Sequence, residues 1–179
     1  MNTGQKLISQ EMIHRNVSGG WLRPAVFGAM DGLVSNFALM IGVAGGSQAA
    51  GVDNSTAIVL AGFAGLLAGA FSMAAGEYTS VASQAELALA EIELERKEIL
   101  QNIDKEIDEL AQVWIARGVQ PDTAKKFATE LSRNQDAFID AHSLEEFGVS
   151  TNDLPSAKLA AISSFVSFAI GAMIPLAPY

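Results

Sequence analysis

Three long apolar segments constrain the fold of this chain more than any other feature. They cover residues 24–46, 57–81 and 157–178, and the first two contain one charged residue each. At a rise of 1.5 Å per residue, each segment is long enough to cross a hydrocarbon layer of roughly 30 Å as a helix. A helix satisfies its backbone hydrogen bonds internally, as hydrocarbon requires. The segments therefore predict an all-α membrane protein with three transmembrane helices.

Glycines recur at four-residue spacing in the first two apolar segments. Gly28 is followed by Gly32, and Gly65 is followed by Gly69. Such pairs place a strip of missing side chains on one helix face and let two helices approach closely in lipid. We expect packed transmembrane helices rather than isolated anchors.

Charge is confined to one part of the chain. The net charge is −9, and residues 86–153 hold sixteen Asp or Glu against seven Lys or Arg, whereas the remaining residues are balanced. This segregation predicts an acidic segment that attracts cations and disfavours nucleic acid as a partner. Because the chain contains no cysteine, thiolate metal sites and cysteine nucleophiles are excluded. Any metal ligands must be oxygen, nitrogen or thioether atoms.

The distribution of basic residues predicts the orientation in the membrane. Lys6, Arg15 and Arg23 precede the first apolar segment, whereas the loop at residues 47–56 has no Lys or Arg. Basic flanks stay on the cytosolic side, so the N-terminus is expected to be cytosolic. The acidic segment then also lies in the cytosol.

The acidic segment has the pattern of a small helical bundle inserted between the second and third spans. A helix is predicted from residue 82 to a C-cap at Gly118, with a break near Asn102, and a second helix starts at Pro121. A third helix is predicted to end at Gly148. The expected core consists of Leu94, Ile99, Ile107, Leu110, Trp114, Phe127, Leu131, Phe138 and Ile139.

These patterns divide the chain into four parts. Residues 1–22 form an N-terminal cytosolic or interfacial segment, and residues 23–82 form the first two transmembrane helices. Residues 83–153 form a cytosolic metal-binding helical domain, and residues 154–179 form the third transmembrane helix.

Two carboxylates lie inside apolar segments, where an ionised side chain costs several kcal/mol. Asp31 and Met73 are each about eight residues from the cytosolic end of their antiparallel spans, so they are predicted at similar depth. Glu77 lies one turn from Met73 on the same face. Two carboxylates and a thioether suit Fe²⁺ or Mn²⁺ better than Ca²⁺ or Mg²⁺. The alternative is that Met73 is packing and Glu77 reaches the interface.

The acidic segment contains a second candidate site. Its candidate ligands are the i, i+3 pairs Glu95 with Glu98 and Glu106 with Glu109, and the i, i+4 pair His142 with Glu146. Each pair projects from one helix face, and carboxylate pairs on facing helices are how helical bundles bind paired metal ions. The alternative is an acidic helix face that is only solvated.

Three stretches resemble one known family closely. They are RPAVFGAMDGLVSNFALMIGVAGG, AGAFSMAAGEYTSVASQAE, and ERKEI followed by an acidic helix, and they resemble the vacuolar iron transporter family. The resemblance implies five transmembrane helices, a cytosolic metal-binding domain after the second, and a homodimer with the ion path at its interface. It also implies proton-coupled export of Fe²⁺ or Mn²⁺ from the cytosol.

The resemblance also assigns roles to residues. Asp31 and Met73 match the family's membrane-embedded ion-binding residues, and Glu77 matches the glutamate of its GEY stretch. Glu95, Glu98, Glu106, Glu109 and Glu146 match the glutamates of its cytosolic site. His142 stands where some members have a metal-binding methionine, and Ser143 replaces the methionine that can follow it.

The expected function is transport of Fe²⁺ or Mn²⁺ across a bacterial inner membrane, with protons and a second copy of the chain as partners. The chain is expected to lack the family's last two spans, which leaves a membrane-anchored metal buffer as one alternative. A structural membrane protein with an acidic docking domain is the other. No enzyme is expected because no nucleophile and base motif is visible, and no resident cofactor is predicted. The sequence does not determine whether the transported metal is iron or manganese, because both bind carboxylates and histidine.

Overall fold

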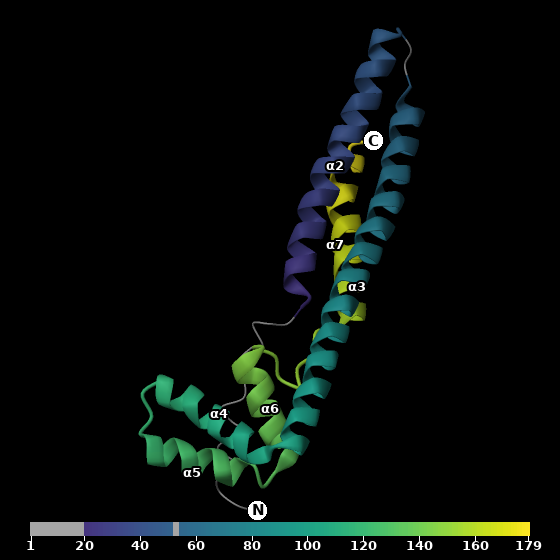
Figure 1. Ribbon diagram of the computed structural model, residues 1–179. Coiled ribbons are helices and arrows are strands. Elements are labelled where there is room, and N and C mark those ends of the chain that lie inside the picture. Colours follow the sequence, from purple (N-terminus) through teal and green to yellow (C-terminus); the bar gives the residue numbers. More distant parts are fainter. Residues whose placement is uncertain (1–19, 52–53) are drawn as a thin grey trace, which may run out of the picture. The chain divides into compact units, whose positions relative to one another are not determined.

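The computed structural model describes residues 20–51 and 54–179 of the chain, and every regular element within them is a helix (Figure 1). The expected all-α class is therefore confirmed. The helices are α2 (Leu22–Ala49), α3 (Ser55–Gln101), α4 (Ile103–Ala116), α5 (Pro121–Leu131), α6 (Gln135–Glu146) and α7 (Ala157–Leu176).

Three of these helices, α2, α3 and α7, are long and apolar enough to cross a membrane, as expected. The 47 residues of α3 extend for about 70 Å, more than twice the thickness of a hydrocarbon core. Only its first part is apolar, because charged residues become frequent from Glu86 onward. The first part of α3 is therefore the part that is apolar enough to cross a membrane, and the span predicted at residues 57–81 lies within it.

The chain divides into two compact units, and α3 contributes to both. We call the first the membrane unit: it contains α2, α3 up to Ala74, and α7 from Ile162. The second, the helical unit, is residues 75–161 and contains the rest of α3 with α4, α5 and α6.

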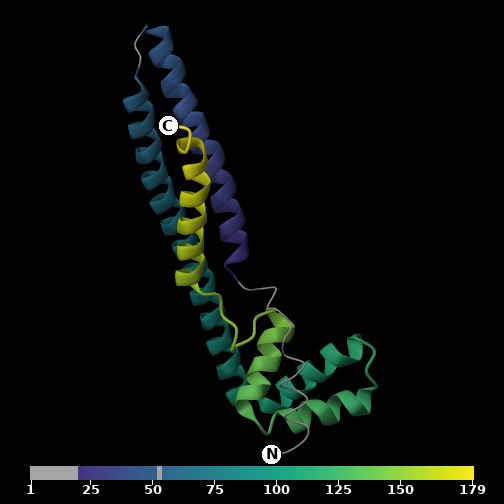
Figure 2. The ribbon, with the colours of Figure 1, turned by 180° about the vertical axis from the view of Figure 1, so that it is seen from behind.

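In the membrane unit, α2, α7 and the first part of α3 run side by side, as both ribbon views show (Figures 1 and 2). The core between them consists of Met40, Ile58, Leu66, Ala70, Phe168, Ala172 and Leu176. Large apolar side chains on the outer faces, such as Phe27, Phe37 and Ile170, remain about half exposed. Apolar side chains on both faces of a helix are typical of membrane spans rather than of soluble amphipathic helices.

Glycines let α2 and α7 approach closely. A Cβ atom at Gly32 would lie 2.2 Å from the carbonyl oxygen of Phe168, and one at Gly171 would lie 2.1 Å from that of Ala29. Both contacts are with backbone, which cannot move aside as a side chain can. The prediction that small residues permit close helix packing is confirmed, and for Gly32 the partner helix is α7.

Local signals end the helices of the helical unit where the sequence predicts. Asn102 ends α3 and caps α4, because its side-chain oxygen accepts a hydrogen bond from the backbone N–H of Lys105 at 3.3 Å. Gly118 follows α4 with φ of +95°, and Gly148 follows α6 with φ of +69°. Both angles lie in the left-handed region that glycine adopts without a steric penalty.

Seven of the nine expected core residues lie in the core of the helical unit, five of them buried and two, Trp114 and Leu131, partly buried. Its buried members are Ile92, Ile99, Ile107, Leu110, Ala111, Ala124, Ala128, Phe138 and Ile139. The prediction for Leu94 is wrong, since this side chain is exposed two residues from Ile92, on another face of α3. The prediction for Phe127 is also wrong: alanines fill the buried face of α5, and the Phe127 ring stays half exposed.

Candidate metal centres

The helical unit brings three predicted ligands together across two helices. Glu95 on α3 and His142 and Glu146 on α6 each present an atom, and the three atoms lie within 4.8 Å of one another. Nδ1 of His142 is 3.1 Å from Oε1 of Glu95 and 3.6 Å from Oε1 of Glu146. The i, i+4 pair on α6, His142 and Glu146, therefore lies beside Glu95, which is distant in the sequence.

Burial sets the electrostatics of this group. The side chains of Glu95 and His142 are 4% and 1% exposed, whereas that of Glu146 is 35% exposed. Burial, together with the negative charges of Glu146 and Glu106, raises the pKa of Glu95 from 4.5 to about 7. A cation in this position would offset both effects, because it stabilises the ionised carboxylate.

One buried ligand atom of this group, Oε1 of Glu95, has no hydrogen-bond partner among the residues that the structure describes. This oxygen is close to Nδ1 of His142, but the two atoms do not form a hydrogen bond. Buried polar atoms are almost always satisfied, so unsatisfied ones call for a ligand. Carboxylate oxygens and an imidazole nitrogen suit Fe²⁺ and Mn²⁺. The residues present therefore fit a divalent metal ion.

The other predicted ligands of the helical unit are not part of this group of three. Glu106 is buried and Glu109 is exposed, and Nζ of Lys105 lies 3.3 Å and 3.1 Å from their carboxylates. Burial raises the pKa of Glu106, whereas the Lys105 ammonium lowers the pKa of Glu109. Glu98 is exposed. The sequence analysis missed Lys105, although a lysine beside two predicted ligands signals that they have another partner.

The membrane unit brings Asp31 and Met73 to one pocket of about 270 Å³. The lining also includes the polar side chains of Ser35, Asn36 and Ser72. Asp31 is exposed at the surface of this unit and Met73 is partly buried. Glu77 is one turn beyond Met73 on α3, is partly buried, and is not among the lining residues. A carboxylate, an amide, hydroxyls and a thioether give this pocket the oxygen and sulfur donors that Fe²⁺ or Mn²⁺ binds.

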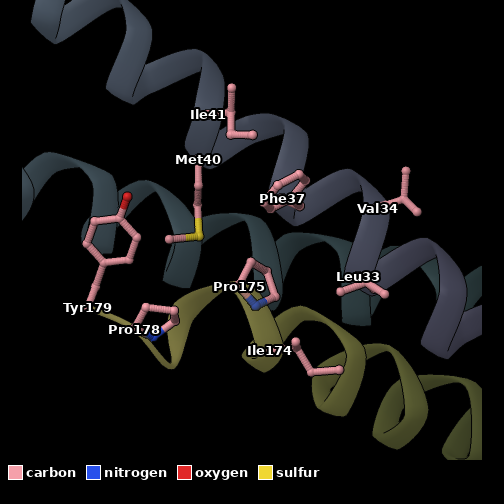
Figure 3. Close-up of a pocket in the computed structure, with 9 residues that line it drawn as sticks. All are labelled: Leu33, Val34, Phe37, Met40, Ile41, Ile174, Pro175, Pro178 and Tyr179. Carbon is pink, nitrogen blue, oxygen red and sulfur yellow. The ribbon is translucent and has the colours of Figure 1, made fainter.

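A larger pocket of about 700 Å³ in the same unit has a different chemical character. Figure 3 shows side chains of α2 such as Phe37 and Met40 on one side, and residues of α7 and the following turn such as Pro175 and Tyr179 on the other. The lining is almost entirely hydrocarbon, so it cannot replace the hydration shell of a cation. Of these two pockets, the one at Asp31 is therefore the candidate for ion binding.

Residues 22–179, which include both candidate centres, match the sequence model of a known family. The chain belongs to the VIT family. Together with the three long apolar helices, this membership makes the chain an integral membrane protein. The resemblance seen in the DGLVSNF and GEYTSVASQ stretches is thereby confirmed.

This VIT-family chain is similar to proteins of plants and of an amoeba. It is 28% identical to vacuolar iron transporter 1 of Eucalyptus grandis over 98% of its own length, and 32% identical to vacuolar iron transporter 1 of Oryza sativa over 90%. It is 37% identical to a vacuolar iron transporter of Acanthamoeba castellanii over 91%. The matched regions cover 68%, 62% and 58% of these relatives, so the chain spans only part of their length.

Proposed function

We propose that this chain transports Fe²⁺ or Mn²⁺ out of the cytosol and that Asp31 and Met73 bind the ion during its passage. The relatives are named as transporters and not as enzymes, which supports transport over catalysis. The observation that carries the proposal is the pocket that Asp31 and Met73 share. A carboxylate in an apolar span is costly unless it meets a cation or a proton.

The helical unit would collect ions from the cytosol for this pathway. Glu95, His142 and Glu146 supply oxygen and nitrogen ligands within one compact unit, so ion capture does not depend on the membrane unit. Glu98, Glu106 and Glu109 lie near enough to raise the pKa of Glu95 by their charge, and they would add to the attraction for cations. Glu77 would assist transfer of the ion near the entrance of the pathway.

Several further features belong to the proposal. Asp31 is exposed on the membrane unit, and a carboxylate facing lipid is unfavourable, which supports a homodimer in which a second copy covers it. Proton coupling, a cytosolic N-terminus and a cytosolic domain at residues 83–153 rest on the family resemblance and the basic flank.

A bacterial plasma membrane gains no support from the relatives, which come from plants and an amoeba. The compartment therefore stays a prediction.

The decisive experiment measures ion flux in proteoliposomes with an imposed pH gradient. Asp31→Asn keeps the shape and polarity of the side chain but removes its charge, so flux should be lost while metal binding by the helical unit remains. Glu86→Gln makes the same chemical change at an exposed residue of α3 and should leave flux unchanged. Wild-type flux in the Asp31→Asn variant would refute the proposed pathway.

A metal buffer remains a second candidate, because the group of three ligands is complete within the helical unit. In that case the wild-type chain would bind Mn²⁺ and show no flux with or without a pH gradient. A structural docking protein would neither bind Mn²⁺ nor transport it. The same vesicle preparation, combined with a metal titration, separates the three functions.

A further inference from the structure

Asn36 is the most deeply buried polar side chain that lines the pocket at Asp31. It is 2% exposed and lies on α2, five residues after Asp31. Its Nδ2 donates a hydrogen bond of 2.8 Å to the backbone carbonyl of Ala172 on α7. Only the NH₂ group of an amide can donate to a carbonyl, so this bond fixes the orientation of the side chain. The amide oxygen then has to face away from Ala172.

That amide oxygen, Oδ1, is buried and has no hydrogen-bond partner among the described residues. It lies close to α3, because a Cβ atom at Gly65 would be only 2.7 Å from it. Asn36 and Gly65 both line the pocket that contains Asp31 and Met73. An unsatisfied amide in an apolar environment costs free energy, so a residue selected only for packing would be apolar at this position.

We infer that Oδ1 of Asn36 is a further ligand of the transported cation, beside the carboxylate of Asp31 and the thioether of Met73. The inference rests on the proposed function. An amide oxygen is a hard donor that binds Fe²⁺ or Mn²⁺ without adding charge. A second carboxylate would hold the ion more tightly and slow its release, whereas a neutral ligand held by α7 strengthens binding moderately.

Asn36→Leu tests the inference in the full chain, because leucine has a similar volume and no ligand atom. Fe²⁺ flux is measured under anoxic conditions in proteoliposomes, and each rate is expressed per folded protein as judged by size-exclusion chromatography. The concentration of Fe²⁺ at half-maximal flux should rise about tenfold, which corresponds to about 1.4 kcal/mol. A residue with only a packing role would change the amount of folded protein and leave this concentration unchanged.

Gly65→Ala is a second test of the inference, and it leaves the Asn36 amide intact. The new methyl group would meet Oδ1 of Asn36 at 2.7 Å and the side chain of Leu39 at 2.6 Å, so Oδ1 must shift. The half-maximal concentration should rise in this variant as well. If Asn36→Leu does not fold, this variant decides the question.

Ser164→Ala is the matched control. Ser164 is fully buried in the same unit, and its hydroxyl also has no hydrogen-bond partner within residues 20–51 and 54–179, but it does not line the pocket. Its removal should leave the half-maximal concentration unchanged. Unchanged values in folded Asn36→Leu or, failing that, in Gly65→Ala would overturn the inference and leave the proposed transport intact. Absence of flux in the wild-type chain would instead reject the proposed function itself.

Discussion

The raised pKa of Glu95 predicts that metal binding by the helical unit depends steeply on pH near neutrality. A metal ion binds the ionised carboxylate, so protons compete with it. With a pKa of about 7, the ionised share of Glu95 rises from about one tenth at pH 6 to about nine tenths at pH 8. A glutamate with the ordinary pKa of 4.5 would be almost fully ionised throughout. Glu95 alone should therefore increase the affinity about tenfold between these two pH values.

Calorimetric titration with Mn²⁺ at pH 6, 7 and 8 measures this dependence on the full chain in detergent. The comparison is with Glu95→Gln, which keeps the size of the side chain and removes its titration. Both proteins should carry Asp31→Asn, so that the membrane pocket does not contribute. Other titrating ligands are common to both proteins, so the ratio of the two affinities should change about tenfold from pH 6 to pH 8. An unchanged ratio would refute the assignment of Glu95 as a buried ligand.

The same shift has the opposite effect on the metal-free protein. The folded state holds the Glu95 proton more tightly than the unfolded chain does, because its pKa is raised. Its contribution to stability is therefore complete below pH 4.5 and is lost as the pH rises through about 7. With a chelator present, the melting temperature of the wild type should fall from pH 5 to pH 8 more than that of Glu95→Gln.

Two further predictions concern the membrane unit and the topology. Gly32→Ala should lower the melting temperature in detergent by several degrees, because the added methyl would meet the carbonyl of Phe168 at 2.2 Å. Gly42→Ala is the control and should not lower it, because a methyl there would have nothing within 4 Å. Equal melting temperatures for the two variants would contradict the packing of α2 on α7. The chain has no native cysteine, so in oriented vesicles Ser55→Cys should react with an impermeant reagent from outside and Thr123→Cys only from the cytosolic side. The reverse pattern would invert the proposed direction of transport.

Local signals in the sequence predicted most of the helical architecture. The apolar segments, the break at Asn102 and the glycines at 118 and 148 act through backbone geometry and solvation within a few residues. They therefore required no knowledge of distant contacts. The misplaced core residues Leu94 and Phe127 show where this reasoning ended, because the face of a helix that becomes buried depends on its neighbours.

For the candidate ligands, too, the sequence determined some features and the tertiary structure determined others. The sequence alone determined that Asp31 is a costly charge in an apolar helix and that His142 and Glu146 share a face, since both follow from helix periodicity and from the free energy of burying charge. Only the tertiary structure decided that Glu95 is the partner of that pair. It also fixed the orientation of the Asn36 amide, with Oδ1 close to Gly65, through a hydrogen bond to a residue 136 positions away. Contacts between helices depend on how their surfaces pack, and periodicity within one helix carries no information about the register of another.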